Sequence, residues 1–524
     1  MFSHLLSATL WGIDAYPVDV EVDISRGLPS FHIVGLPDEA VSESRERVRA
    51  ALRNIGFSLP PQRITVNLSP GDIRKEGVLF DLPIALGILI SQNLINKNDP
   101  LLKDSLFAGE LSLDGRIKPI KGALSLAILA KQNNLSLFIP YKNRKEASII
   151  DNIDIYPVFS LLDLILFLKG ENKKEKIKNE ELEPLSSLNS HYSIDFSEVK
   201  GQLYPKRAIQ IGAAGGHNII LIGPPGSGKS MLAKRIPTIL PPLTKEEAIE
   251  VTRIHSIRGL LSEDVPIITE RPFRSPHSSS SLVSLVGGGR IPLPGEISLA
   301  HNGVLFMDEF GEFRKDVLNS LRQPLEDGYI TISRANYTTK FPSRIMLVAA
   351  SNPCPCGFLN DPVKECTCTP NQIIRYRSKL SGPIMDRIDI HVDVPRLSYE
   401  DIVGNSKEGK KKEVKEETSK EMKKRVMLSR EMQRERYKNI PNITLNSHLK
   451  GKLIEEYCKL THSATLLLKE AFTKLGLSGR AYTSILKVAR TISDIEQKEL
   501  IDEYSISEAI GYRSLDKEFP VYFN

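Results

Sequence analysis

The sequence predicts an α/β protein with a first α/β or α+β unit, a second and longer α/β unit, and a small all-helical unit. Three observations support this division. Strand and helix patterns alternate through residues 1–168, a second alternation runs over 196–398, and apolar residues recur at helical spacing from about 445 to 513. With 524 residues, 41% of them hydrophobic, the chain is long enough to bury more than one core.

The first unit opens with a strand pattern, because valines at 18–22 alternate with acidic residues, as on a half-buried strand. Residues 37–55 predict a helix, since acidic side chains occupy its first turn and Gly56 follows its end. A second strand is expected at 64–68 and a mostly apolar helix at 82–93. The first domain is therefore assigned to residues 1–168.

Two stretches of different composition separate the units. Residues 169–195 are rich in Glu, Lys, Asn and Ser and poor in apolar residues, which predicts a linker. Residues 399–440 are dense in Lys and Glu, which predicts a charged insertion, and the Lys/Glu run within it at 407–425 is expected to be either a solvated helix or a flexible segment. The helical domain is then expected over 441–515.

The overall charge is mild. The 70 Lys and Arg residues against 64 Asp and Glu leave a net charge of +6, which excludes a histone-like polycation and requires any nucleic-acid site to be a local patch. No apolar run reaches the roughly 18 residues of a membrane span. Arg26 is the first cationic side chain, so the cationic start of a secretory signal is absent. We expect no membrane partner and a cytoplasmic location.

A phosphate-binding loop is the strongest motif. The strand at 218–222 runs into a segment of the form G-x-x-x-x-G-K-[ST], and a helix pattern follows. The glycines let backbone amides surround a phosphate, Lys229 supplies a charge for the β- and γ-phosphates, and the Ser230 hydroxyl is a ligand for Mg²⁺. The residues assigned to ATP binding are Gly223, Pro224, Pro225, Gly226, Ser227, Gly228, Lys229 and Ser230.

Two later strands end in polar residues that suit ATP hydrolysis. The apolar strand at 304–307 ends in Asp308, expected to hold Mg²⁺, and Glu309, expected to polarise the attacking water. The strand at 345–350 leads to Asn352, which is either a sensor that orients this water or an ordinary strand-terminating Asn before Pro.

Two arginines are candidates for contacts with the γ-phosphate. Arg387 precedes another alternating strand and is expected to reach the γ-phosphate of a neighbouring subunit, which implies a ring. Arg480 opens a helix of the C-terminal domain and is expected to report the nucleotide state to it. Surface ion pairing is the alternative for both.

Four cysteines fall on one short segment. Cys354, Cys356, Cys366 and Cys368 offer four thiolates, which suit a closed tetrahedral Zn²⁺ site. The one-residue spacing within each pair is tighter than usual. Free or redox-active thiols and disulfides remain alternatives.

Residues 327–340 predict a β-hairpin. Ring-shaped motors can direct such hairpins into a central pore, where Arg334 and Lys340 would follow the phosphates of DNA. A solvated edge hairpin is the alternative.

The phosphate loop, the acidic pair, the sensor and the two arginines occur in an order that resembles an AAA+ ATPase of the magnesium-chelatase-like branch. The segments at 271–277 (RPFRSPH), 294–301 (PGEISLAH) and 352–357 (NPCPCG) are more specific and resemble the ComM/YifB competence-protein family. The resemblance covers nearly the whole chain. Where that family has a second His after the first of these segments, this sequence has Ser278.

The first domain is similar to the Lon protease-type domain found in this family, on the segments at 70–77 and 109–120. The position of the protease serine falls within Val78-Leu79, and that of the catalytic lysine falls near Leu124. Because a Ser–Lys dyad needs both groups, proteolysis is not expected. We expect this domain to assemble subunits or to contact DNA.

The resemblance implies a P-loop AAA+ α/β core over 196–398, a C-terminal helical lid and an N-terminal Lon protease-like α+β domain. It further implies a hexameric motor that uses ATP and Mg²⁺ to move branch points in DNA during homologous recombination of incoming DNA. Its expected partner is branched or single-stranded DNA. The residues alone indicate an oligomeric Mg-ATPase. A chelatase-type or protein-remodelling ATPase that does not act on DNA is the alternative.

Overall fold

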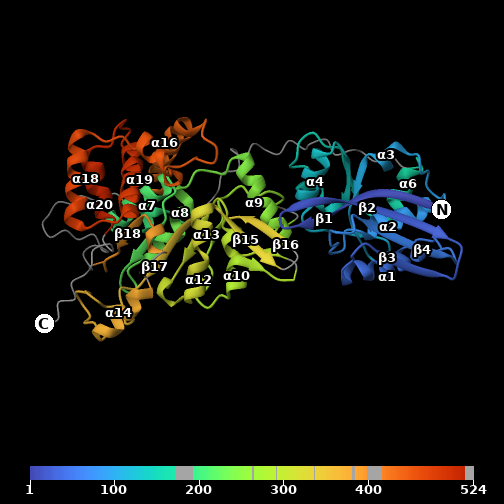
Figure 1. The fold of residues 1–524 in the computed structure, drawn as a ribbon, viewed down its shortest axis with the longest axis horizontal. Coiled ribbons are helices and arrows are strands. Elements are labelled where there is room, and N and C mark those ends of the chain that lie inside the picture. Colours follow the sequence, from blue (N-terminus) through green and yellow to red (C-terminus); the bar gives the residue numbers. More distant parts are fainter. Residues whose placement is uncertain are drawn as a thin grey trace.

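The computed structural model describes residues 1–171, 193–262, 265–290, 292–334, 337–379, 384–397 and 416–513. Most of the expected linker and the first part of the expected charged insertion lie outside these ranges. Within them the molecule is elongated, with the N-terminal domain at one end, the second α/β domain in the middle and the C-terminal helices at the other end (Figure 1). None of the described helices has the length and apolar composition needed to cross a membrane.

A mixed seven-stranded sheet of order β3-β4-β2-β1-β5-β8-β9 organises the N-terminal domain. Its strands are β1 (Phe2–Trp11), β2 (Asp14–Ser25), β3 (Ser30–Val34), β4 (Arg63–Ser69), β5 (Ser105–Phe107), β8 (Ser136–Pro140) and β9 (Ile155–Val158). Its helices are α1 (Glu39–Asn54), α2 (Asp81–Ser91), α3 (Pro100–Lys103), α4 (Ala123–Gln132), α5 (Arg144–Ala147) and α6 (Leu161–Leu168), and β6 (Glu110–Leu111) pairs with β7 (Ile117–Lys118). The helices expected at 37–55 and 82–93 correspond to α1 and α2.

The middle domain is built on a parallel five-stranded sheet of order β11-β14-β17-β10-β18. Its strands are β10 (Ile219–Ile222), β11 (Phe273–Arg274), β14 (Val304–Met307), β17 (Met346–Ser351) and β18 (Ile390–Asp393). Its helices are α7 (Leu203–Gly215), α8 (Lys229–Ile239), α9 (Lys245–Arg258), α10 (Leu282–Val286), α11 (Glu296–Leu299), α12 (Lys315–Ser320), α13 (Arg322–Asp327) and α14 (Pro370–Lys379). Because all five strands are parallel, their carboxyl ends meet at one edge, where ligands of such sheets bind.

Two hairpins project from this domain. They are β12 (Gly287–Gly288) with β13 (Leu293–Pro294), and β15 (Tyr329–Arg334) with β16 (Tyr337–Pro342). The second is the hairpin expected at 327–340.

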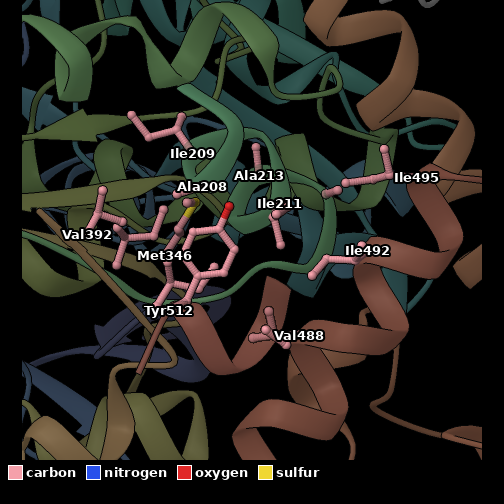
Figure 2. Close-up of a cluster of buried hydrophobic side chains, with 14 of the residues drawn as sticks. Ala208, Ile209, Ile211, Ala213, Met346, Val392, Val488, Ile492, Ile495 and Tyr512 are labelled. Carbon is pink, nitrogen blue, oxygen red and sulfur yellow. The ribbon is translucent and has the colours of Figure 1, made fainter. Parts of the chain in front are cut away.

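The C-terminal domain is helical, as expected. It consists of α16 (Ser419–Tyr437), α17 (Lys452–Tyr457), α18 (His462–Leu475), α19 (Gly479–Ile495) and α20 (Glu503–Gly511). One shared core joins these helices to α7 and to the parallel sheet, and Figure 2 shows Ile211 of α7 near Ile492 of α19.

The structure corrects one expectation about residues 399–440. From Ser419 onward they form α16, which begins with a capping box and buries Met422 and Val426 in the shared core. A helix can carry many Lys and Glu residues and still bury a narrow apolar stripe. This part is therefore a packed helix of the C-terminal domain and not a solvated insertion.

The N-terminal domain packs directly on α9. Ala248 and Val251 of α9 join an apolar cluster formed mainly by α4 and its neighbours in the N-terminal domain. In the same interface the Ser256 hydroxyl accepts from the Gly122 amide at 2.9 Å and donates to the buried carboxylate of Glu146. Burial raises the pKa of Glu146.

Candidate functional site

The phosphate loop joins β10 to α8 at the carboxyl edge of the parallel sheet. Gly226 and Gly228 have φ angles of +79° and +92°, which favour glycine. Lys229 is 8% exposed, and its ammonium donates to the carbonyl oxygens of Gly223 and Pro224 at 2.6 and 2.9 Å. Burial lowers the pKa of Lys229, and the charge of Asp308 opposes this shift. A phosphate at this position would give the ammonium an anionic partner in place of the loop carbonyls.

Residues that are distant in the sequence meet beside this lysine. The Ser230 hydroxyl donates to Asp308 Oδ2 at 2.6 Å, and Lys229 Nζ donates to Asn352 Oδ1 at 3.3 Å. Asp308 follows β14 and Asn352 follows β17, and these strands lie side by side. The hydroxyl and the carboxylate are oxygen ligands of the kind that Mg²⁺ prefers.

Glu309 lies at the mouth of the same site. It is exposed and adopts a left-handed backbone conformation with φ of +51°, and its amide donates to Asp308 Oδ1 at 2.9 Å. The Ser278 hydroxyl approaches Glu309 Oε2 at 3.5 Å. The sequence alone assigned no role to Ser278. The signal available was its place after the segment at 271–277, since β11 pairs with β14 and leads toward the carboxylate.

The structure places Arg387 at the opposite edge of the sheet. Its carbonyl oxygen accepts from the Asn218 side chain at 2.9 Å, and Asn218 directly precedes β10, whereas the phosphate loop follows β10. The Arg387 guanidinium pairs with Glu326 of α13, and its side chain is 13% exposed. The length of β10 therefore separates Arg387 from the phosphate loop of its own chain.

Arg480, the second residue of α19, contacts Asp386, which directly precedes Arg387. Its guanidinium donates to Asp386 Oδ2 at 2.7 Å, and its side chain is 57% exposed. Asp386 and Arg387 belong to the same short 3₁₀ turn. Each arginine thus pairs with a carboxylate of the same chain, and Arg480 joins the helical domain to the 3₁₀ turn that contains Arg387.

The four cysteines form one compact cluster. The sulfur atoms of Cys354, Cys356, Cys366 and Cys368 all lie within 4.8 Å of one another, and none of these residues forms a disulfide. The Sγ of Cys354 lies 3.4 Å from that of Cys356 and 3.7 Å from that of Cys366. Four thiolates about 2.3 Å from a tetrahedral Zn²⁺ would lie about 3.8 Å apart. A hydrogen bond from the Phe358 amide lowers the pKa of Cys356 to about 5.

The cysteine segment packs on the phosphate loop. Gly357, with φ of +86°, lies so close to Pro225 that a Cβ at this glycine would be 2.6 Å from Pro225 Cδ. The same Cβ would lie 3.8 Å from Cγ of Asn352. A displacement of this segment would therefore reach both the phosphate loop and Asn352.

The hairpin of β15 and β16 is less accessible than a free pore loop. Thr339 of β16 packs on Gly12, between β1 and β2 of the N-terminal domain, and a Cβ at Gly12 would lie 2.5 Å from Thr339 Cγ2. Lys340 is exposed, and its ammonium lies 4.9 Å from the centre of the Tyr329 ring. Arg334 ends β15, and its side chain lies outside what the structure describes.

Three family models match this chain. Residues 195–402 match the model described as magnesium chelatase, subunit ChlI, and residues 416–513 match the C-terminal model of that subunit. Residues 20–143 match a further model described as subunit ChlI of Mg-chelatase. These matches cover parts of all three domains.

Individual proteins match over nearly the full length. Competence protein ComM of Haemophilus influenzae is 42% identical over 506 residues, which cover 96% of each chain. The protein YifB of Escherichia coli is 41% identical, covering 97% of this chain and 96% of its own. Lon protease 2 of Bacillus subtilis is 27% identical over 164 residues, which cover 28% of this chain and 29% of its own.

Proposed function

This chain belongs to the ComM and YifB family of Mg-chelatase-like AAA+ proteins, and we propose that it is an Mg²⁺-dependent ATPase. The observation that carries the proposal is the convergence of Lys229, Ser230, Asp308 and Asn352 at the carboxyl edge of the parallel sheet. The family implies ATP and Mg²⁺ as the groups that such a site takes.

Each residue has one proposed role. The loop from Gly223 to Ser230 holds the phosphates of ATP, and Ser230 and Asp308 hold Mg²⁺. Glu309 is the group that accepts a proton from the attacking water. Asn352 orients this water at the γ-phosphate. Mg²⁺ supplies charge neutralisation on the phosphate oxygens when it is bound.

We propose that the active form is a ring, with six subunits as the family resemblance implies. The support is the placement of Arg387 and Arg480 at the sheet edge opposite the phosphate loop of their own chain. An arginine there can stabilise the transition state only at a neighbour's nucleotide. To reach it, Arg387 must exchange its partner Glu326 for the γ-phosphate.

Mixing two inactive variants tests this arrangement. Lys229→Ala removes the phosphate-loop charge, and Arg387→Ala removes the arginine. In a ring formed from both, some interfaces combine the intact loop of one variant with the intact arginine of the other. We expect the mixture to hydrolyse ATP well above either variant alone. A mixture as inactive as its components would overturn the action of Arg387 on a neighbouring subunit.

We further propose that ATP hydrolysis drives movement on DNA, as a branch-migration helicase in homologous recombination during natural transformation. The support is the full-length similarity to a protein named for competence. The candidate DNA contacts Arg334 and Lys340 lie on a hairpin that the N-terminal domain partly covers, so they require a route for DNA along its exposed face.

The DNA proposal is tested with a labelled synthetic four-way junction and MgATP. The matched control for Lys229→Ala is Lys234→Ala, which removes the same charge from an exposed position on the same helix. We expect wild type and Lys234→Ala to resolve the junction and Lys229→Ala to fail. If ATP is hydrolysed but the junction neither binds nor moves, the alternative of a protein-remodelling ATPase replaces the DNA motor.

Finally, we propose that Cys354, Cys356, Cys366 and Cys368 hold a structural Zn²⁺. Four thiolates leave no open position on the metal, so its contribution is to fix the segment that packs on Pro225. One equivalent of zinc in the purified protein, lost in Cys366→Ser, is the expected result. Zinc-free protein that remains fully folded and active would exclude this role.

A further inference from the structure

The N-terminal domain has a pocket of about 280 Å³, far from the proposed ATP site (Figure 1). It lies where the end of α1 passes the edge strand β3 and the start of β4. Phe31 and Ile64 are buried at its base, and Leu59 and Pro60 are half-buried at its side. The recess therefore has an apolar base, while the rest of its lining includes the polar residues Ser30, Ser58 and Gln62 and two arginines.

Two arginines at the opening of this pocket are charged and have few anionic partners nearby. Arg49 and Arg53 are exposed, line the pocket together and lie four residues apart on α1, which places them on one side of the helix. Arg49 has only a long ion pair with Glu46, at 4.0 Å, among the described residues. The side chain of Arg53 forms no ion pair or hydrogen bond with the residues that the structure describes. By contrast, Arg47 of the same helix is bound to the buried carboxylate of Asp81 at 2.7 Å.

This combination selects a ligand chemistry. Two weakly partnered guanidinium groups beside each other suit a phosphate, which they can contact with paired hydrogen bonds. An apolar recess next to them suits the flat face of a base, and the side chains of Ser30 and Gln62 at the wall offer polar groups to its edge. An acidic peptide would use the arginines and leave the recess unused.

We propose that this pocket binds one nucleotide unit of a single DNA strand, with its phosphate on Arg49 and Arg53 and its base in the recess. The proposal rests on the proposed action on DNA and names a contact for it outside the ATPase core. Because the recess accepts a single base, the base must be unstacked, so single-stranded DNA binds in preference to duplex. Arg49, Arg53 and the half-buried Leu59 are then binding residues, and none of them touches the ATP site.

The test measures binding of a fluorescent oligothymidine to the full chain by anisotropy at several salt concentrations. The pocket variant is Arg49→Ala/Arg53→Ala. The matched control is Arg116→Ala/Arg144→Ala, which removes one exposed and one half-buried arginine of the same domain that already have partners, Asp114 and the carbonyl oxygen of Tyr141. We expect the pocket variant to lose about tenfold in affinity and its salt slope to fall by about 0.7, because the one phosphate held by both arginines contributes about 0.7 on a single strand. The control should bind as wild type does.

A second comparison separates the base from the phosphate. Leu59→Ala keeps both arginines and removes part of the apolar wall, so we expect it to weaken oligothymidine about fivefold and an abasic oligonucleotide hardly at all. Basal ATP hydrolysis should be unchanged in all these variants.

The outcomes are distinct. If wild type binds the oligonucleotide and the pocket variant binds equally well, this inference fails and the DNA motor stands. If polyglutamate displaces the oligonucleotide from wild type but not from the pocket variant, the pocket is a site for acidic peptides and the nucleotide assignment is wrong. If wild type binds no DNA, the proposed action on DNA fails and this inference fails with it.

Discussion

The contact between Gly357 and Pro225 makes a sharp prediction about the cysteine segment and ATP hydrolysis. In Gly357→Ala the new methyl group would lie 2.6 Å from Pro225 Cδ and 2.8 Å from its Cγ. Ordinary contact needs about 3.5 Å or more, so the phosphate loop and the cysteine segment must separate by close to 1 Å. Misplacement of this size near reacting groups can lower a rate about 100-fold.

The cost to stability has two parts that a control separates. A side chain at φ of +86° costs about 1–2 kcal/mol in backbone strain, and the overlap with Pro225 adds about 1–3 kcal/mol. Gly56 has φ of +92°, and a Cβ there would meet no atom within 4 Å. Gly56→Ala therefore carries the backbone strain without the overlap.

The assay is steady-state ATP hydrolysis of both variants, with zinc content and thermal unfolding measured on the same samples. We expect Gly357→Ala to lower kcat/KM for ATP at least tenfold, because its methyl group displaces the phosphate loop, and Gly56→Ala to match wild type. Equal activity of the two variants, at equal loss of stability, would refute the mechanical link between the cysteine segment and the phosphate loop.

Three further predictions concern the ATP site and the cores around it. Asp494→Ala should lower the free energy of unfolding of the helical domain by about 3–5 kcal/mol, measured by urea denaturation, because Arg490, only 2% exposed, loses its carboxylate; an effect below about 1 kcal/mol would contradict this. Ser278→Ala should lower kcat for ATP about fivefold without changing KM, since a hydroxyl near Glu309 is lost; an unchanged kcat would leave the hydroxyl without a role. Burial and a nearby arginine lower the pKa of His391 to about 3, so this residue stays neutral in the folded state while the unfolded chain takes up a proton below about 6.5. The contribution of neutral His391 to the free energy of unfolding is therefore full above about pH 6.5 and should fall by about 2 kcal/mol between pH 7 and 5. The free energy of unfolding of His391→Gln should depend less on pH than that of wild type, and an equal dependence would refute the assignment.

The arrangement of the proposed ATP site was predictable because its parts are local. A glycine-rich turn between a strand and a helix specifies its own backbone, and acidic or amide residues after buried strands meet at one edge of a parallel sheet. Asp308 and Asn352 accordingly lie beside Ser230 and Lys229, where the sequence indicated. The cysteine cluster also follows from spacing, since both pairs lie on one short segment.

Other features depended on contacts between distant residues. The density of charged residues in 399–440 predicted exposure to solvent. Met422 and Val426 nevertheless pack α16 into the shared core. Burial of a helix depends on one apolar stripe and not on its mean composition. The motifs around Arg387 and Arg480 indicated a role in phosphate contact, but they did not indicate at which end of the strands these residues lie. Only the pairing of Asp386 with Arg480 and of Glu326 with Arg387 placed them away from their own phosphate loop.

The sequence by itself determined the order of the domains, the phosphate loop and the chemical types of the residues proposed to surround ATP, because each of these is specified within one strand, loop or helix. Only the tertiary structure decided which of those residues share a site, that the cysteine segment packs on Pro225, and that Arg49 and Arg53 line a pocket with an apolar base. These are relations between segments far apart in the chain. Their geometry comes from packing, which no single stretch of sequence contains.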